Sequence, residues 1–157
     1  AEFGPAKRWP AEHFATLAQQ LDQAGYTVWI IGSGKDQEAG ATIESLSGGL
    51  AINLCGRTNL TDAIDLMSAA DIVVSNDSGL MHVAAALQRP LIALFGSSSP
   101  LFTPPLSKHV AILQHAVPCS PCFARTCRYG HLDCLTKLLP ESVMASIRTL
   151  NPESHTA

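Results

Sequence analysis

Charged side chains are scarce in this sequence, at 15% of 157 residues, and the formal net charge is only −3. This low charge excludes a disordered, highly solvated chain and leaves no basic surface for nucleic acid. No apolar run reaches the roughly 18 residues that a membrane-spanning helix needs. A basic segment followed by an apolar core is lacking at the start, so we expect no secretion signal and a cytoplasmic location. An initiator methionine is lacking too, and we expect a truncated start.

Apolar residues are plentiful, at 46%, which suffices for one buried core. Short β-branched runs alternate with segments of helical periodicity. This order predicts an α/β fold, a Rossmann-like parallel sheet with helices on both faces. We expect one domain over residues 1–150, then a polar tail at 151–157. The expected helices cover 11–24, 35–46, 61–69, 79–87 and 138–150, and the expected strands cover 26–31, 51–54, 71–75, 90–95 and 110–113.

Two loops of this sequence follow expected strands and lead into expected helices, at residues 32–36 and 75–82. In parallel sheets, ligands bind outside the carboxyl ends of the strands. Backbone N–H groups at a helix N-terminus are unpaired there, and the helix dipole favours an anion. These loops are therefore the candidate ligand-binding segments.

The first loop, residues 32–36, departs from two known phosphate-binding patterns. Asp36 stands where a P-loop has Ser or Thr, and Gln37 replaces the third glycine of a dinucleotide fingerprint. One interpretation is a simple glycine turn between strand and helix. The other is a nucleotide site, in which the Asp36 carboxylate accepts hydrogen bonds from ribose hydroxyls.

The second loop carries the stronger pattern. Asp77 or Ser78 can cap the next helix, and Gly79 lets a ligand approach the backbone closely. His82 follows one turn later, so its imidazole leans back toward the same N-terminus. Together they favour a diphosphate site. The alternative is that Asp77 and Ser78 only cap the helix and His82 only packs.

Lys7 and Arg8 precede the first expected helix. They are either ordinary surface charge or, in the case of Lys7, a cation that neutralises a departing diphosphate.

Four cysteines lie in an irregular segment, at Cys119, Cys122, Cys127 and Cys134. Their number suits a four-thiolate zinc site, but the second half does not repeat the spacing of the first pair. Zinc binding, disulfides formed by oxidation after purification, and free thiols all stay open. Cys55, at a strand end, is expected to be a small buried hydrophobic residue.

Residues 4–10, 55–60 and 76–86 resemble the ADP-heptose–lipopolysaccharide heptosyltransferases, which are glycosyltransferases of family 9. The resemblance runs from residue 1 to about residue 150. The Asp-Ser-Gly-x-x-His pattern at 77–82 marks the wider family, and residues 118–134 are similar to the type II members, which add the second heptose of the inner core. The resemblance implies one half of a GT-B enzyme, the C-terminal domain that binds the nucleotide sugar.

The implied reaction is an inverting transfer of heptose from ADP-heptose to the inner core of lipopolysaccharide, without an essential metal or cofactor. Because that acceptor is lipid-linked, the resemblance also implies peripheral contact with the cytoplasmic face of the inner membrane. Lys7 is expected to contact the donor's phosphate and heptose and to stabilise the leaving group, while Asp36 binds the adenosine ribose. The other donor-binding residues expected are Ser33, Asp77, Ser78, Gly79 and His82.

The resemblance also implies that the acceptor pocket and the general base lie in an N-terminal domain outside this sequence. The chain alone is then expected to bind the donor weakly and to catalyse nothing. Two alternatives remain. One is a transferase that uses a different sugar nucleotide, and the other is a non-enzymatic module whose cysteines bind a metal or a partner.

Overall fold

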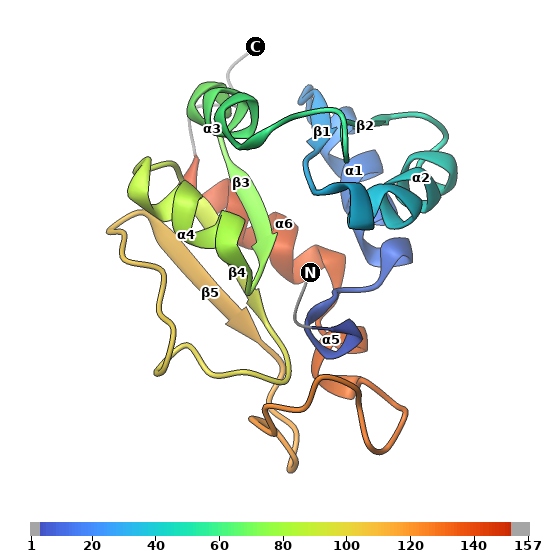
Figure 1. Ribbon diagram of the computed structural model, residues 1–157, viewed down its shortest axis with the longest axis vertical. Helices are drawn as coiled ribbons and strands as arrows, with labels where there is room; N and C mark the ends of the chain where they lie inside the picture. The colour runs from blue at the N-terminus through green and yellow to red at the C-terminus, as the bar shows by residue number, and fades with distance from the viewer. Residues whose placement is uncertain (1–3, 152–157) are drawn as a thin grey trace.

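The computed structural model describes residues 4–151. It contains two β-sheets, each built of parallel strands (Figure 1). The smaller sheet pairs β1 (Val28–Ile30) with β2 (Ala51–Asn53), and the larger has the order β3-β4-β5. Its strands are β3 (Val73–Asn76), β4 (Leu91–Phe95) and β5 (Val110–Gln114). All three strand pairs are parallel. The predicted parallel α/β architecture is thereby confirmed.

Helices connect these strands in the predicted alternation. They are α1 (Ala11–Gln23), α2 (Gln37–Leu46), α3 (Leu60–Ala69), α4 (Gly79–Ala86), α5 (Asp133–Thr136) and α6 (Pro140–Leu150), with short 3-10 helices at Pro5–Lys7 and Gly34–Asp36. The sequence did not predict α5 or the 3-10 helices, because such short turns carry too little periodicity. Of the expected polar tail, only Asn151 lies within the described residues.

Strand β4 lies in the middle of the larger sheet, and its side chains alternate between two apolar cores. Ile92 and Leu94 belong to a cluster with residues of α1 and α6. Leu91, Ala93 and Phe95 belong to a second cluster with residues of α3 and α4. All five are at most 1% exposed. Both faces of this sheet are therefore covered, as its continuous apolar run predicts.

The parallel strands are divided between two sheets, because β1 and β3 share no ladder. The register partners of β1 lie only in β2, and those of β3 lie only in β4. Helix α1 contributes to clusters under both sheets: Leu17 and Leu21 pack with residues of β4, and Ala15 and Ala18 pack with residues of the smaller sheet. Shared packing on α1 thus holds the sheets together where a ladder does not.

Among the helices of residues 4–151, none is both long and apolar enough to span a membrane.

Candidate functional site

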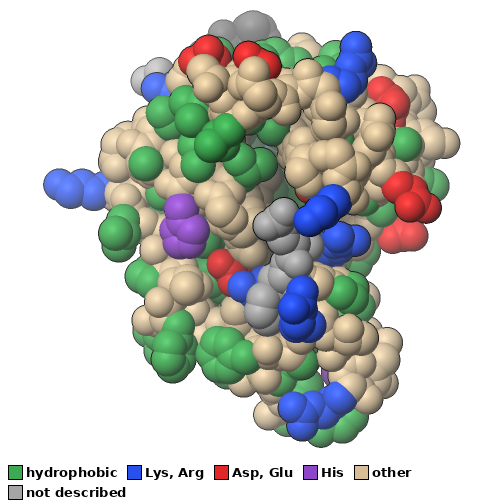
Figure 2. Space-filling model, viewed as in Figure 1, with side chains coloured by type: hydrophobic (Ala, Val, Ile, Leu, Met, Phe, Trp, Pro, Cys, Tyr) green, Lys and Arg blue, Asp and Glu red, His purple; other side chains and the backbone are tan. Residues whose placement is uncertain are grey.

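The predicted site residues lie around one cleft, which reaches between the two sheets and over the carboxyl end of β3. Its volume is about 1890 Å³, which exceeds the roughly 300–1,000 Å³ of typical small-ligand pockets. Figure 2 shows a hollow on this face with Lys and Arg side chains beside it. All seven predicted site residues line this cleft: Lys7, Ser33, Asp36, Asp77, Ser78, Gly79 and His82.

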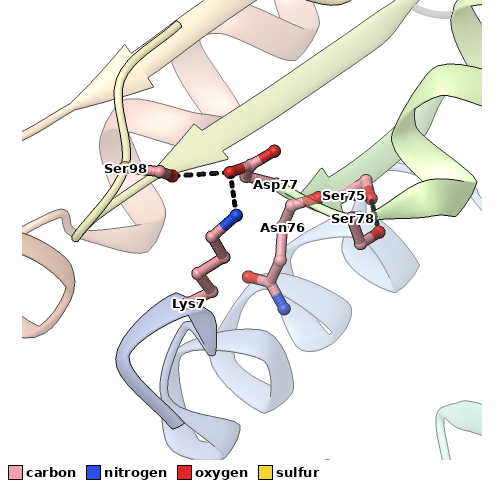
Figure 3. A network of polar contacts seen from close by, with 6 residues as sticks. All are labelled: Lys7, Ser75, Asn76, Asp77, Ser78 and Ser98. Carbon is pink, nitrogen blue, oxygen red and sulfur yellow. Dashed lines mark hydrogen bonds and ion pairs between the residues drawn. The ribbon is translucent and has the colours of Figure 1, made fainter. Parts of the chain in front are cut away.

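An ion pair between Lys7 and Asp77 stands at the centre of this site (Figure 3). Lys7 Nζ lies 2.5 Å from Asp77 Oδ2, and the two side chains are only 15% and 5% exposed. The hydroxyl of Ser98 donates to the same Oδ2 at 2.6 Å. A buried carboxylate is tolerated when it is paired and hydrogen-bonded, and both conditions hold here.

The backbone before α1 places Lys7 beside Asp77. Lys7 ends the 3-10 helix that begins at Pro5. Gly4 precedes this helix with φ of 142°, and a Cβ on it would lie 2.6 Å from the carbonyl oxygen of Arg125. The same carbonyl accepts a hydrogen bond from Ala6 N–H at 3.1 Å. This position therefore requires glycine, and a loop far away in sequence fixes the segment.

Trp9 anchors the same segment to the end of β3 and to the core. Its backbone N–H donates to Asn76 Oδ1 at 3.1 Å, and its indole N–H donates to the Leu138 carbonyl at 2.7 Å. The ring is 2% exposed and meets Phe14 edge-on, with ring centroids 4.8 Å apart. Lys7 therefore sits on a rigid support.

The N-terminus of α4 has no side-chain cap. Ser78 occupies the N-cap position in an extended conformation, but its side chain makes no capping hydrogen bond. Its hydroxyl instead lies 3.3 Å from that of Ser75. Asp77 binds Lys7 and Ser98, so the interpretation of Asp77 and Ser78 as mere helix caps was wrong.

Open space surrounds this helix start. A Cβ on Gly79 would meet nothing within 4 Å among residues 4–151, so its small size is not needed for packing against them. His82 is exposed on the cleft, which contradicts its alternative interpretation as a packing residue. The uncapped N–H groups, with a cation beside them, form a surface suited to an anion.

The first loop forms a local capping box. Asp36 Oδ2 accepts hydrogen bonds from the backbone N–H of Ser33 at 3.0 Å and from its hydroxyl at 2.8 Å. Gly32 is required here, because a Cβ on it would lie 2.9 Å from both Asp36 Cβ and Cys55 Sγ. Cys55 is 2% exposed, as predicted, and burial followed by the charge of Asp36 raises the pKa of its thiol. The loop is thus a rigid turn that presents a carboxylate to the cleft.

The cysteines of residues 119–134 are free thiols. Burial raises the pKa of the Cys134 thiol, and its neighbours Cys122, Cys119 and Cys127 raise it further. Within residues 4–151, no three His, Cys, Asp or Glu side chains are grouped so that they could hold a metal ion. The zinc interpretation therefore gains no support.

The sequence analysis missed Ser98 and the role of Arg125. Ser98 lies in the loop that follows the carboxyl end of β4, where ligands of parallel sheets are expected to bind, so the same rule could have found it. Arg125 acts through its backbone carbonyl, for which a sequence carries no signal.

Comparison with known proteins adds independent findings. Residues 1–133 match glycosyltransferase family 9 (heptosyltransferase). The chain is 45% identical over 157 residues to the lipopolysaccharide heptosyltransferase 2 of Salmonella typhimurium, covering 98% of this chain and 45% of that protein. It is 52% identical over 118 residues to the lipooligosaccharide heptosyltransferase 2 of Haemophilus influenzae, covering 73% of this chain and 34% of that protein.

Two solved structures of family 9 glycosyltransferases are also similar to this chain. The structure of the Escherichia coli ADP-heptose lipopolysaccharide heptosyltransferase II matches with a TM-score of 0.86 and 42% identity, covering 99% of this chain and 45% of that one. A family 9 glycosyltransferase from Veillonella parvula matches with a TM-score of 0.80 and 28% identity, covering 95% of this chain and 43% of that one. The chain thus spans less than half the length of these relatives. It belongs to glycosyltransferase family 9, the heptosyltransferase family.

Proposed function

We propose that this chain is the donor-binding domain of an inverting glycosyltransferase that transfers heptose from ADP-heptose to the inner core of lipopolysaccharide. The observation that carries the proposal is the Lys7–Asp77 pair beside the uncapped N-terminus of α4, within a family 9 fold. The names of the relatives, heptosyltransferase 2 and ADP-heptose lipopolysaccharide heptosyltransferase II, support this donor and this acceptor.

The diphosphate of the donor is assigned to the start of α4. Backbone N–H groups around Ser78 and Gly79 offer hydrogen bonds there, and the helix dipole adds favourable charge. Because Gly79 has no side chain, the backbone can be approached closely. Lys7 stabilises the negative charge that develops on ADP as the glycosidic bond breaks. His82 is exposed one turn further along α4 and is assigned as another residue that contacts the sugar nucleotide.

The adenosine is assigned to the turn at Ser33. Asp36 is oriented by two hydrogen bonds from Ser33, and its carboxylate faces the cleft. A carboxylate held in this way at a helix start is the group that binds ribose hydroxyls in many α/β nucleotide sites.

An inverting transfer also needs a base that removes the proton of the acceptor hydroxyl. We assign this base and the acceptor pocket to a second domain, with residues 1–150 as the donor domain. The lipid-linked acceptor would then be met at the cytoplasmic face of the inner membrane by peripheral contact.

Calorimetric titration of this chain with ADP-heptose, ADP and UDP tests the proposal. Binding of both adenine ligands, with UDP much weaker, is the expected result. Preference for UDP would move the chain to a transferase with a different donor. Binding of none of the three by a folded sample would reject the proposed function of this chain.

Two substitutions tie any binding to the proposed site. Asp77→Ala and His82→Ala should each weaken ADP-heptose binding about tenfold, the effect of losing one polar contact of about 1.4 kcal/mol. Circular dichroism checks that both variants stay folded. Unchanged affinity in both would show that the nucleotide binds elsewhere.

A further inference from the structure

Three consecutive serines follow β4, and all three are buried. Ser97, Ser98 and Ser99 are 1%, 3% and 7% exposed. Serine is mostly a surface residue, and burying a hydroxyl without a partner costs free energy. Their hydroxyls have different surroundings. Within the described part of the chain, Ser97 Oγ has no hydrogen-bond partner, and Ser99 Oγ accepts only from the nearby Leu101 N–H at 3.2 Å. Ser98 Oγ donates to a buried carboxylate, at 2.6 Å from Asp77 Oδ2.

The backbone around Ser98 is held on two sides. The Ser97 carbonyl accepts from Phe123 N–H at 2.7 Å, and the Gly96 carbonyl accepts from the Ser120 hydroxyl at 2.9 Å. Asp77 is held against the same strand, because its N–H donates to the Leu94 carbonyl at 3.1 Å. The backbone before Ser98 is therefore held by the loop that contains Ser120 and Phe123, and Asp77 is held by the end of β4.

The bond sets the orientation of the Asp77 carboxylate. Ser98 and Lys7 both bind Oδ2, and Figure 3 shows them reaching it from different elements. Among residues 4–151, the polar contacts of the Asp77 side chain all go to this oxygen, which leaves Oδ1 for a ligand in the cleft. A carboxylate only accepts hydrogen bonds, so the matching ligand group is a donor such as a sugar hydroxyl.

We propose that Ser98 is a positioning residue for sugar-nucleotide binding, which acts by fixing the Asp77 carboxylate between itself and Lys7. The inference rests on the proposed function, since the ligand is the nucleotide sugar assigned to this cleft. Without the Ser98 hydroxyl, Asp77 keeps Lys7 as its partner but loses the contact that fixes its rotation. Supporting contacts of this kind hold a binding group in its productive geometry.

The test compares Ser98→Ala with Ser97→Ala in this chain. Both remove a buried hydroxyl at adjacent positions, but only Ser98 has a partner. Calorimetry with ADP-heptose should show affinity lowered about tenfold in Ser98→Ala, the size expected for one hydrogen bond to a charged group. Ser97→Ala should bind like the unsubstituted chain. Equal affinity of all three proteins would overturn the inference.

A double-mutant cycle separates positioning from a general structural effect. In an Asp77→Ala background, Ser98→Ala should have no further effect on affinity, because the group it positions is gone. Where calorimetry cannot follow the weaker binding of the Asp77→Ala protein, the four affinities are read from the rise in Tm that millimolar ADP-heptose produces. Additive losses in the cycle would overturn the inference while leaving the proposed function intact. If the unsubstituted chain binds no nucleotide, the proposed function fails and this inference fails with it.

Discussion

At the scale of single residues, the site depends on the ion pair between Lys7 and Asp77, which are 70 positions apart in the sequence. The Asp77 side chain is 5% exposed, so its charge is stabilised by its partners and hardly by water. Lys7 is the cationic partner, and it comes from a segment that other parts of the chain hold in place. The same two residues therefore serve both the stability of the chain and its proposed chemistry.

Replacing the cation should expose this double role. Lys7→Met leaves the Asp77 carboxylate buried with the Ser98 hydroxyl as its remaining partner, so we expect the free energy of unfolding to fall by about 3 kcal/mol. ADP affinity should also fall, since the diphosphate loses a cation. Urea unfolding and calorimetry measure the two effects. Lys108→Met removes an equal charge from an exposed position outside the cleft and should change neither.

A second substitution separates the two effects. Adding Asp77→Asn to Lys7→Met removes the buried charge, so stability should recover while ADP affinity stays low. If the Lys7→Met protein were as stable and bound ADP as tightly as the unsubstituted chain, the ion pair would have neither role.

At the scale of elements, much of this fold could be predicted from the sequence. The helix at 11–24 is observed as α1 (Ala11–Gln23), and the apolar run at 90–95 is observed as β4 (Leu91–Phe95). Both succeed because periodicity and burial follow directly from the local pattern. The ligand-binding loops after β1 and β3 were also predicted, because ligands of parallel sheets generally bind at the carboxyl ends of the strands.

What could not be predicted depends on contacts between distant segments. The missing ladder between β1 and β3 is a property of how two sheets pack on α1, and no local pattern records it. The contact of Gly4 with the Arg125 carbonyl joins two irregular segments. The sequence left open whether Asp77 caps α4 or binds a ligand, and it did not predict the ion pair with Lys7, because the position before a helix is the same in each case.

Two glycines next to strand ends give opposite predictions. Gly79→Ala places a methyl in open space at the start of α4, so the free energy of unfolding should not fall. Nucleotide affinity should fall, because the methyl covers the N–H groups assigned to the diphosphate. Gly96→Ala brings a Cβ within 2.6 Å of Leu135 Cγ and should lower the free energy of unfolding by about 2 kcal/mol. Chemical denaturation and calorimetry on both variants check this pair.

The ADP affinity of the Gly79→Ala protein tests whether the diphosphate binds at the start of α4. A Gly79→Ala protein that binds ADP with unchanged affinity would mean that the diphosphate does not approach the α4 backbone. A destabilised Gly79→Ala protein would contradict the open space above it.

At the scale of the whole molecule, the proposed function assigns to this chain the donor side of a reaction site. The cleft carries groups suited to the donor and the leaving diphosphate, namely Lys7 and the N-terminus of α4. The relatives that it matches are more than twice as long as the matched region, which covers 45% of the Salmonella typhimurium protein. On the proposed function, this chain should bind the donor without reacting.

We therefore expect this chain to bind ADP-heptose and to release no ADP when a lipid-linked core acceptor is added. A fusion that adds the N-terminal half of a relative should release ADP at a measurable rate. In that fusion, Lys7→Met should lower kcat more than it weakens donor binding, because leaving-group charge develops only in the transition state. ADP release by the chain alone would instead place the base within it, and His82, an exposed imidazole in the cleft, would be the first candidate. Replacing His82 by Gln in the reacting chain would then decide whether its imidazole removes the proton.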